Sequence, residues 1–239
     1  MNAAAGSGVS RDARGVVTYT VDEPRTRNAL STRALDDIDR LLNTLSGDAS
    51  VRVVVFTGKG NVFSSGADRS ELADPKTIAR ATDLMISILT KIEQFPVPVV
   101  CRVNGAAFGA GLALVAAADI SVASSDAVFA LPEVRFGLVP GPAAAVCLGR
   151  IGQAAALDVL LTGRRFGAAD AEQMQLLTAV VARDDLDATL ERYVAELLLG
   201  HPSAVTATRR LVRSLSRHPV WTTGCAAQVQ QATRRCQIS

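Results

Sequence analysis

The sequence has few of the features that are typical of secreted, membrane or metal-binding proteins. Its 239 residues include four cysteines and two histidines, and no two cysteines form a CxxC pair. We therefore expect reduced thiols rather than disulfides, and no zinc site. The longest apolar run, over residues 106–118, is shorter than the roughly 20 residues that a membrane-spanning helix needs. Because the N-terminus also lacks the apolar stretch of a secretory signal, we expect a cytoplasmic protein that does not contact a membrane.

An excess of one charge is also missing. The 25 basic and 23 acidic residues give a net charge of +2, whereas a nucleic-acid-binding protein usually has a larger or more clustered basic excess. Nucleic acid is therefore not an expected partner. Apolar residues make up 49% of the chain, which is enough for a large core and excludes an intrinsically disordered protein. Each histidine precedes a proline at an expected helix start, a position typical of turns and caps.

Strands and helices are expected to alternate over most of the chain. Runs rich in β-branched residues over 16–21, 51–57 and 97–103 predict strands, the last two buried on both faces. A stripe of leucine and isoleucine after Ser31 predicts a capped helix that ends near Leu45. We therefore expect three parts: a disordered N-terminus over residues 1–14, an α/β core with parallel strands over 15–185, and a helical C-terminal segment over 186–239.

Two glycine-rich turns follow the two buried strands. The first turn, over residues 58–66, leads through Gly66, Ala67 and Asp68 into an expected helix, and the second, over 104–111, leads through Gly109 and Ala110 into another. Unpaired backbone N–H groups at a helix N-terminus favour negative charge, and glycine lets a ligand approach the backbone closely. Two such turns that converge could hold an oxyanion. Taken singly, each is more often an ordinary turn, and no dinucleotide, P-loop or serine-hydrolase motif is present.

Glu133 is the one acidic residue in an apolar stretch over residues 129–141. A carboxyl group in such surroundings should have a raised pKa, so that it could accept and return a proton near neutral pH. The alternative is a structural salt bridge to Arg135, which would share its face if the segment were extended. The residues themselves leave both possibilities open.

Taken together and in order, five segments resemble the enoyl-CoA hydratase/isomerase, or crotonase, superfamily. They are NAL at 28–30, FSSGAD at 63–68, residues 104–119, PE followed by GLVPG between 132 and 141, and LTG at 161–163 with residues 168–171. The resemblance covers roughly residues 16–215 and is specific for the superfamily but not for the reaction. It implies a crotonase-like spiral of ββα turns with a helical C-terminal segment, a homotrimer or a dimer of trimers, and an acyl-CoA thioester as ligand. Coenzyme A would be part of the substrate, and neither a metal nor a further cofactor is implied.

The resemblance also assigns roles to individual residues. The N–H groups of Ala67 and Ala110 would polarise the thioester carbonyl, Glu133 would be the catalytic acid/base, and the N–H of Gly141 would help to position water. The remaining residues would lie along the coenzyme A or the acyl chain: Arg27, Ala29, Ser65, Gly66, Asp68, Leu72, Gly109, Pro132 and Leu138.

Three departures from the family pattern bear on the reaction. Hydratases carry a second glutamate where this sequence has Ala113, and a methyl group cannot transfer a proton. Dienoyl isomerases carry an aspartate where this sequence has Gly141. Ala143 and Ala144 replace the usual glycine pair, which is expected to narrow the acyl pocket. The sequence also stops near Cys236 without the family's last helix, so the C-terminal segment is expected to be shortened, with consequences for the lid and for assembly.

Three hypotheses remain. The first is an enzyme that favours double-bond isomerisation over efficient hydration, with Glu133 as its sole acid/base. The second is other thioester-enolate chemistry, such as decarboxylation or C–C cleavage. The third is a non-catalytic acyl-CoA-binding protein of the same fold, a possibility suggested by Ala113 and by the shortened C-terminus.

Overall fold

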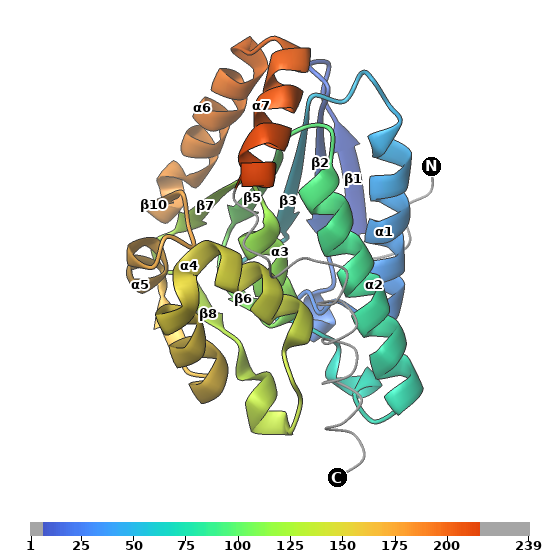
Figure 1. The fold of residues 1–239 in the computed structure, drawn as a ribbon, viewed down its shortest axis with the longest axis vertical. Helices are drawn as coiled ribbons and strands as arrows, with labels where there is room; N and C mark the ends of the chain where they lie inside the picture. Colours follow the sequence, from blue (N-terminus) through green and yellow to red (C-terminus); the bar gives the residue numbers. More distant parts are fainter. Residues whose placement is uncertain (1–6, 216–239) are drawn as a thin grey trace.

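Two sheets and the helices that connect them form the core of the protein. The computed structural model describes residues 7–215 (Figure 1). The larger sheet has the strand order β1-β2-β3-β5-β7-β10 and is parallel except for β1. The smaller sheet has the order β4-β6-β8-β9 and is parallel except for β9. The strand bounds are, in order, Ser7–Arg11, Val16–Val21, Val53–Gly58, Val62–Ser64, Val99–Val103, Ala106–Phe108, Ile120–Ser124, Val128–Ala130, Arg165–Gly167 and Ala179–Val181.

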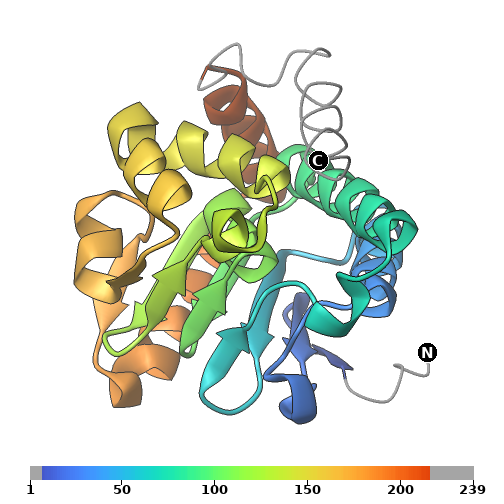
Figure 2. The same cartoon turned by 90° about the horizontal axis from the view of Figure 1, so that it is seen from below.

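The chain winds as a spiral of repeated strand–strand–helix turns. Each turn contributes one strand to each sheet and then a helix: β3 and β4 precede α2 (Pro75–Gln94), β5 and β6 precede α3 (Ala110–Ala117), and β7 and β8 precede α4 (Gly141–Thr162). This confirms the expected crotonase-like spiral. Figure 2 shows the short strands of the second sheet below α3 and α4. Because β4, β6 and β8 are parallel neighbours, the segments that follow them begin at one edge of the smaller sheet, where residues from successive turns meet.

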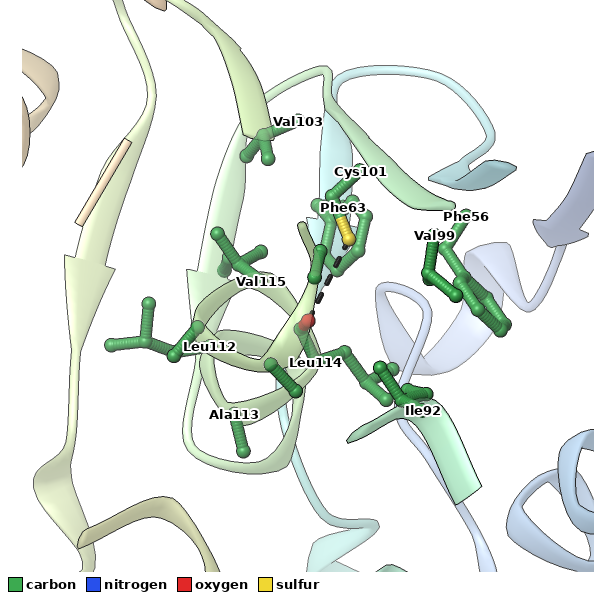
Figure 3. Close-up of a cluster of buried hydrophobic side chains, with 14 of the residues drawn as sticks. Phe56, Phe63, Ile92, Val99, Cys101, Val103, Leu112, Ala113, Leu114 and Val115 are labelled. Carbon is green, nitrogen blue, oxygen red and sulfur yellow. Dashed lines mark hydrogen bonds between the residues drawn. The ribbon is translucent and has the colours of Figure 1, made fainter. Parts of the chain in front are cut away.

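The larger sheet is buried on both faces, as its β-branched strands predict. In β3, Val53 and Val55 pack with Val194 of α6 (Leu186–Leu199), whereas Val54 and Phe56 belong to the main core on the other face. Helix α1 (Thr32–Ser46) covers that second face beside α2, and the Ser31 hydroxyl accepts the Ala34 N–H at 3.2 Å, as expected of an N-cap. The core around α3 includes Phe63, Leu112 and Cys101 (Figure 3).

The buried side chain of Arg209 connects helix α7 (Pro202–Leu215) to the core. The Arg209 side chain is 6% exposed; it pairs with Asp119 at 2.7 Å and donates to the carbonyl oxygens of Glu93 and Phe95 at the end of α2. His201 contacts the Ser203 hydroxyl at 2.9 Å at the start of α7, which fits the expected turn or cap. Residues 216–239, including His218, Cys225 and Cys236, lie outside the described residues.

Three local predictions were wrong. Residues 7–11 are not disordered but form β1, which pairs with β2 over Ser7–Arg11 because alternate backbone groups meet an otherwise open sheet edge. The segment after Ala67 is not a helix but the three-residue 3-10 turn η2 (Arg69–Glu71). The two glycine-rich loops contain the short strands β4 and β6, which pair with each other. The strand expected over 128–130 is present as β8, whereas β4, β6 and β9 were missed because three-residue strands are too short to show a period.

Helix α4 is, by length and composition alone, apolar enough to cross a membrane. Gly152 interrupts it with φ 75° and ψ 167°, so two shorter helices meet there at a kink. Neither piece reaches the roughly 20 residues that a membrane span requires.

Candidate active site

The two glycine turns lie in contact. A Cβ atom added to Gly66 would meet the Phe108 carbonyl oxygen at 2.8 Å and the Gly109 Cα at 3.6 Å. Both glycines have positive φ, 93° at Gly66 and 50° at Gly109, a conformation that side-chain-bearing residues rarely adopt. The contact follows from the pairing of β4 with β6, because parallel neighbours end at the same sheet edge. The residues that follow the two glycines, Ala67 and Ala110, therefore flank one junction.

The amides of Ala67 and Ala110 are not used elsewhere in the described part of the chain. Ala110 is the first residue of α3, so its N–H has no acceptor within the helix. At Ala67, the neighbouring backbone bond runs from the Leu30 N–H to the Gly66 carbonyl oxygen at 2.7 Å, and the Ala67 N–H takes no part in it. Both residues line one cavity of about 120 Å³. Two backbone donors are thus placed beside a small apolar space.

Glu133 faces the same cavity from the 3-10 turn η3 (Pro132–Phe136). Pro132 starts this turn, and Gly137 ends it in the left-handed region with φ 71°. The carboxylate Oε1 lies 2.7 Å from the position that a Cβ on Gly109 would occupy, so the acid touches the second glycine turn. The Oε2 atom is buried without a hydrogen-bond partner among the described residues. Burial raises the pKa of Glu133 to about 7.

The salt bridge to Arg135 does not form. The turn η3 is not extended, and Arg135 instead donates from Nε to the Thr162 carbonyl oxygen at 3.1 Å. Ala113 is fully buried and lines the same cavity. Of the described residues that line this cavity, Glu133 is the one with an ionisable side chain. The space beside the two amides therefore contains one carboxyl group rather than two.

The role expected for Gly141 stays a prediction. Its N–H donates to the Val139 carbonyl oxygen at 2.8 Å, and Gly141 does not line the cavity. Asp68 is also occupied: its carboxylate caps η2 by accepting the Ser70 N–H at 2.9 Å and the Ser70 hydroxyl at 2.8 Å.

The other predicted contact residues fall into two groups. Leu72 and Leu138 line the cavity, whereas Pro132 supports the turn that carries Glu133. Arg27, Ala29 and Ser65 lie on the adjoining segments: the Ser65 N–H donates to the Arg27 carbonyl oxygen at 3.1 Å, and the Ser65 hydroxyl donates to the Thr26 carbonyl oxygen at 2.8 Å. Arg27 is exposed and Ala29 is buried. These residues form the outer edge of the first glycine turn rather than the wall of the cavity.

Asn28 positions this edge, a role that sequence reasoning missed. Its amide nitrogen donates to the carbonyl oxygens of Lys59 and Val62, at 3.0 and 2.7 Å, and its side-chain oxygen accepts the Glu23 N–H. Its φ of 59° is a left-handed conformation that asparagine tolerates better than most residues. That preference was the available signal, because an asparagine at the end of a turn is typical of such a backbone clamp.

A larger cavity of about 680 Å³ lies elsewhere, between α4, α6 and α7. Among its charged residues, Arg209 and Arg213 both pair with Asp119, and they and Arg150 donate to carbonyl oxygens at helix ends. It contains neither glycine turn. Size alone therefore does not identify the reactive centre, and the smaller cavity is the candidate because polar groups without partners converge on it. Among the described residues, no group of three or more His, Cys, Asp or Glu side chains could hold a metal ion.

The raised pKa of Glu133 predicts a pH-dependent cost to folding. Below pH 4.5 the carboxyl group is protonated in both the folded and the unfolded chain and contributes nothing. Between 4.5 and about 7 the unfolded chain loses this proton while the folded chain keeps it, so rising pH favours unfolding. The unfolding free energy of Glu133→Gln minus that of the wild type should therefore be larger at pH 8 than at pH 4, by on the order of 3 kcal/mol. Chemical denaturation of both proteins at the two pH values measures this; a difference that does not change with pH would contradict it.

Comparisons with known proteins agree with this geometry. A model of the enoyl-CoA hydratase/isomerase family matches residues 11–235. The 2,3-dehydroadipyl-CoA hydratase of Escherichia coli (strain K12) is 32% identical over 207 residues, which cover 86% of this chain and 80% of that protein. The crystal structure of an enoyl-CoA hydratase from Mycobacterium avium subsp. paratuberculosis K-10 superimposes with a TM-score of 0.90 at 27% identity, covering 100% of this chain and 96% of that one. That of an enoyl-CoA hydratase from Mycobacterium smegmatis gives 0.85 at 31% identity, with 97% and 90% covered.

Proposed function

Because the chain belongs to the enoyl-CoA hydratase/isomerase family, we propose that it moves the double bond of an enoyl-CoA thioester between the 2 and 3 positions. The observation that supports this most directly is the single cavity shared by the Ala67 and Ala110 amides and the Glu133 carboxyl group. A pair of backbone donors and one acid/base are what such a proton transfer requires. Coenzyme A takes part as a portion of the substrate, and the proposal needs no metal or further cofactor.

In the proposed mechanism the thioester oxygen accepts hydrogen bonds from Ala67 and Ala110. The carboxylate of Glu133 removes a proton from C2 of a 3-enoyl thioester. The electron pair of that C–H bond forms a double bond between C1 and C2, which places negative charge on the thioester oxygen and, through the C3–C4 double bond, on C4. The two amides stabilise the resulting dienolate, an interaction worth about 3–4 kcal/mol per donor in comparable sites. Glu133 then returns the same proton to C4, and the double bond is left between C2 and C3.

Ala113 favours this reaction over hydration. Adding water across the double bond requires activation of a water molecule at C3 while a proton reaches C2, and two carboxyl groups do this best. Here the second position is a methyl group in an apolar wall. The Gly141 amide already donates to the Val139 carbonyl oxygen, so it is not a free donor for water. A proton shuttle between C2 and C4 needs no water and only one carboxyl group.

Separate incubation with 3-enoyl-CoA and 2-enoyl-CoA tests the proposal. We expect interconversion of the two isomers and little 3-hydroxyacyl-CoA, as resolved by liquid chromatography. Formation of 3-hydroxyacyl-CoA as the faster reaction would show that Ala113 does not limit hydration. Tight binding without turnover across enoyl, malonyl-type and 3-oxoacyl thioesters would indicate a non-catalytic acyl-CoA-binding protein, whereas turnover of only the last two classes would indicate decarboxylation or C–C cleavage.

We further propose that the protein acts in the cytoplasm as a trimer or a pair of trimers. Helix α7 supports subunit contact, because Leu211 and Leu215 are each more than half exposed on it, and exposed apolar patches commonly mark protein interfaces. A monomer in sedimentation equilibrium would contradict the proposed assembly.

A further inference from the structure

We infer that the cavity at Glu133 selects a short hydrocarbon acyl group without a charged end, and that Met85 limits its length. This inference rests on the proposed function. It adds a class of substrate, because the same two amides and one carboxyl group would serve acyl chains of many lengths. The evidence for it is the size, the depth and the charge of the cavity wall.

The cavity is small for a ligand site. Its volume is about 120 Å³, whereas pockets for drug-sized ligands usually measure roughly 300–1,000 Å³. An apolar protein cavity of about 150 Å³ holds one benzene molecule. By that comparison the cavity admits an acyl group of about four to six carbons, counted from the thioester carbonyl carbon. A longer chain would have to displace the wall.

Burial distinguishes the mouth of the cavity from its floor. Ala67 is exposed and Leu72 is partly buried, so the coenzyme A side lies here. Leu35 of α1 and Met85 of α2 are 2% and 4% exposed and belong to the main hydrophobic core. An acyl chain that enters past the two amides therefore ends against core side chains rather than in solvent. Of these two side chains, the unbranched Met85 is the longer, so its truncation lengthens the cavity more than truncation of Leu35 would.

The wall offers no partner to a second charge. Its lining residues include no lysine, arginine or histidine, and the hydroxyl of Thr82 already donates to the Ile78 carbonyl oxygen at 2.9 Å. A carboxylate at the far end of the acyl chain would be buried without a counter-charge and near Glu133, both of which are unfavourable. The E. coli relative is named for 2,3-dehydroadipyl-CoA, whose acyl chain ends in such a carboxylate. We therefore infer that this chain, although similar to that protein, does not bind an acyl group with a terminal carboxylate.

Binding of saturated thioesters tests the inference without requiring turnover. Isothermal titration of the full chain with free coenzyme A and with butanoyl-, hexanoyl-, octanoyl- and adipyl-CoA should give the highest affinity for butanoyl- or hexanoyl-CoA. Octanoyl- and adipyl-CoA should each bind at least tenfold more weakly than hexanoyl-CoA. Equal affinities for octanoyl- and hexanoyl-CoA, or for adipyl- and hexanoyl-CoA, would overturn the inference and leave the proposed function standing. If no thioester binds more tightly than free coenzyme A, the proposed function itself fails.

Two variants on α2 then test the role of Met85. Met85→Ala should reduce the tenfold preference for hexanoyl- over octanoyl-CoA to about threefold or less. The matched control Ile92→Ala also removes a buried side chain from α2, but outside the cavity, and it should leave the preference unchanged. Should Met85→Ala fail to fold, Ala81→Leu fills the cavity from a partly buried position and should weaken hexanoyl-CoA at least fivefold more than butanoyl-CoA. Equal shifts in Met85→Ala and Ile92→Ala, or equal weakening of both esters by Ala81→Leu, would rule out a length limit on this wall.

Discussion

Glu133→Gln should lower kcat for isomerisation by about 10²–10⁴-fold while changing KM little. Glutamine keeps the size of the side chain and its place in the apolar cavity but cannot take a proton from C2. Binding should persist because the amides of Ala67 and Ala110 and the apolar wall are unchanged. Steady-state kinetics with 3-enoyl-CoA measure both constants, and an unchanged kcat would remove Glu133 from the mechanism.

Two controls separate loss of the proton carrier from general damage. Glu196→Gln makes the same chemical change at an exposed position on α6 and should leave kcat unaltered. In the wild type, kcat/KM should rise with pH and level off above about 7, since the free enzyme must carry Glu133 as a carboxylate and its pKa is raised to about 7 by burial. The residual activity of Glu133→Gln should lack this step.

The larger elements were predictable because their residues carry a strong periodic pattern. Strand β3 and helix α1 were expected within two residues of their observed bounds, since a β-branched run buried on both faces and a leucine stripe behind a serine cap each leave one favourable conformation. Strands β4 and β6 were not predicted. Their pairing depends on the turns of the spiral being stacked, which is tertiary information that three residues cannot encode.

The chemistry of the site was easier to anticipate than its hydrogen-bond partners. An isolated glutamate in an apolar stretch already implied burial and a raised pKa, and the structure gives both. The sequence could not show whether Gly141 had a free amide, because that depends on the turn that brings the Val139 carbonyl oxygen to 2.8 Å. Nor could it decide between a free Glu133 and an ion pair with Arg135. The 3-10 geometry of η3 settles that choice by sending the arginine to Thr162.

Gly109→Ala should lower kcat by about 10²–10³-fold, the effect of losing one oxyanion donor in comparable enzymes. Gly109 combines φ 50° with ψ −119°, a conformation that strains any residue with a Cβ atom. Relaxing it would turn the following peptide and re-aim the Ala110 N–H. The new methyl group would also lie 2.7 Å from the Glu133 Oε1 and push the carboxyl group aside. The variant thus perturbs both partners of the proposed reaction at once, and kinetics with 3-enoyl-CoA measure the loss.

Gly152→Ala is the matched control for backbone strain. Gly152 also has positive φ, 75°, but it lies at the kink of α4 and a Cβ atom there would meet nothing within 4 Å. Both substitutions should lower the unfolding free energy by about 1–3 kcal/mol, as measured by chemical denaturation. Only Gly109→Ala should also reduce turnover. Equal stability losses with unequal kcat cannot arise from strain alone, so that outcome would assign catalysis to the junction of the two glycine turns. A Gly109→Ala enzyme with wild-type kcat would show instead that the Ala110 amide does not act on the substrate.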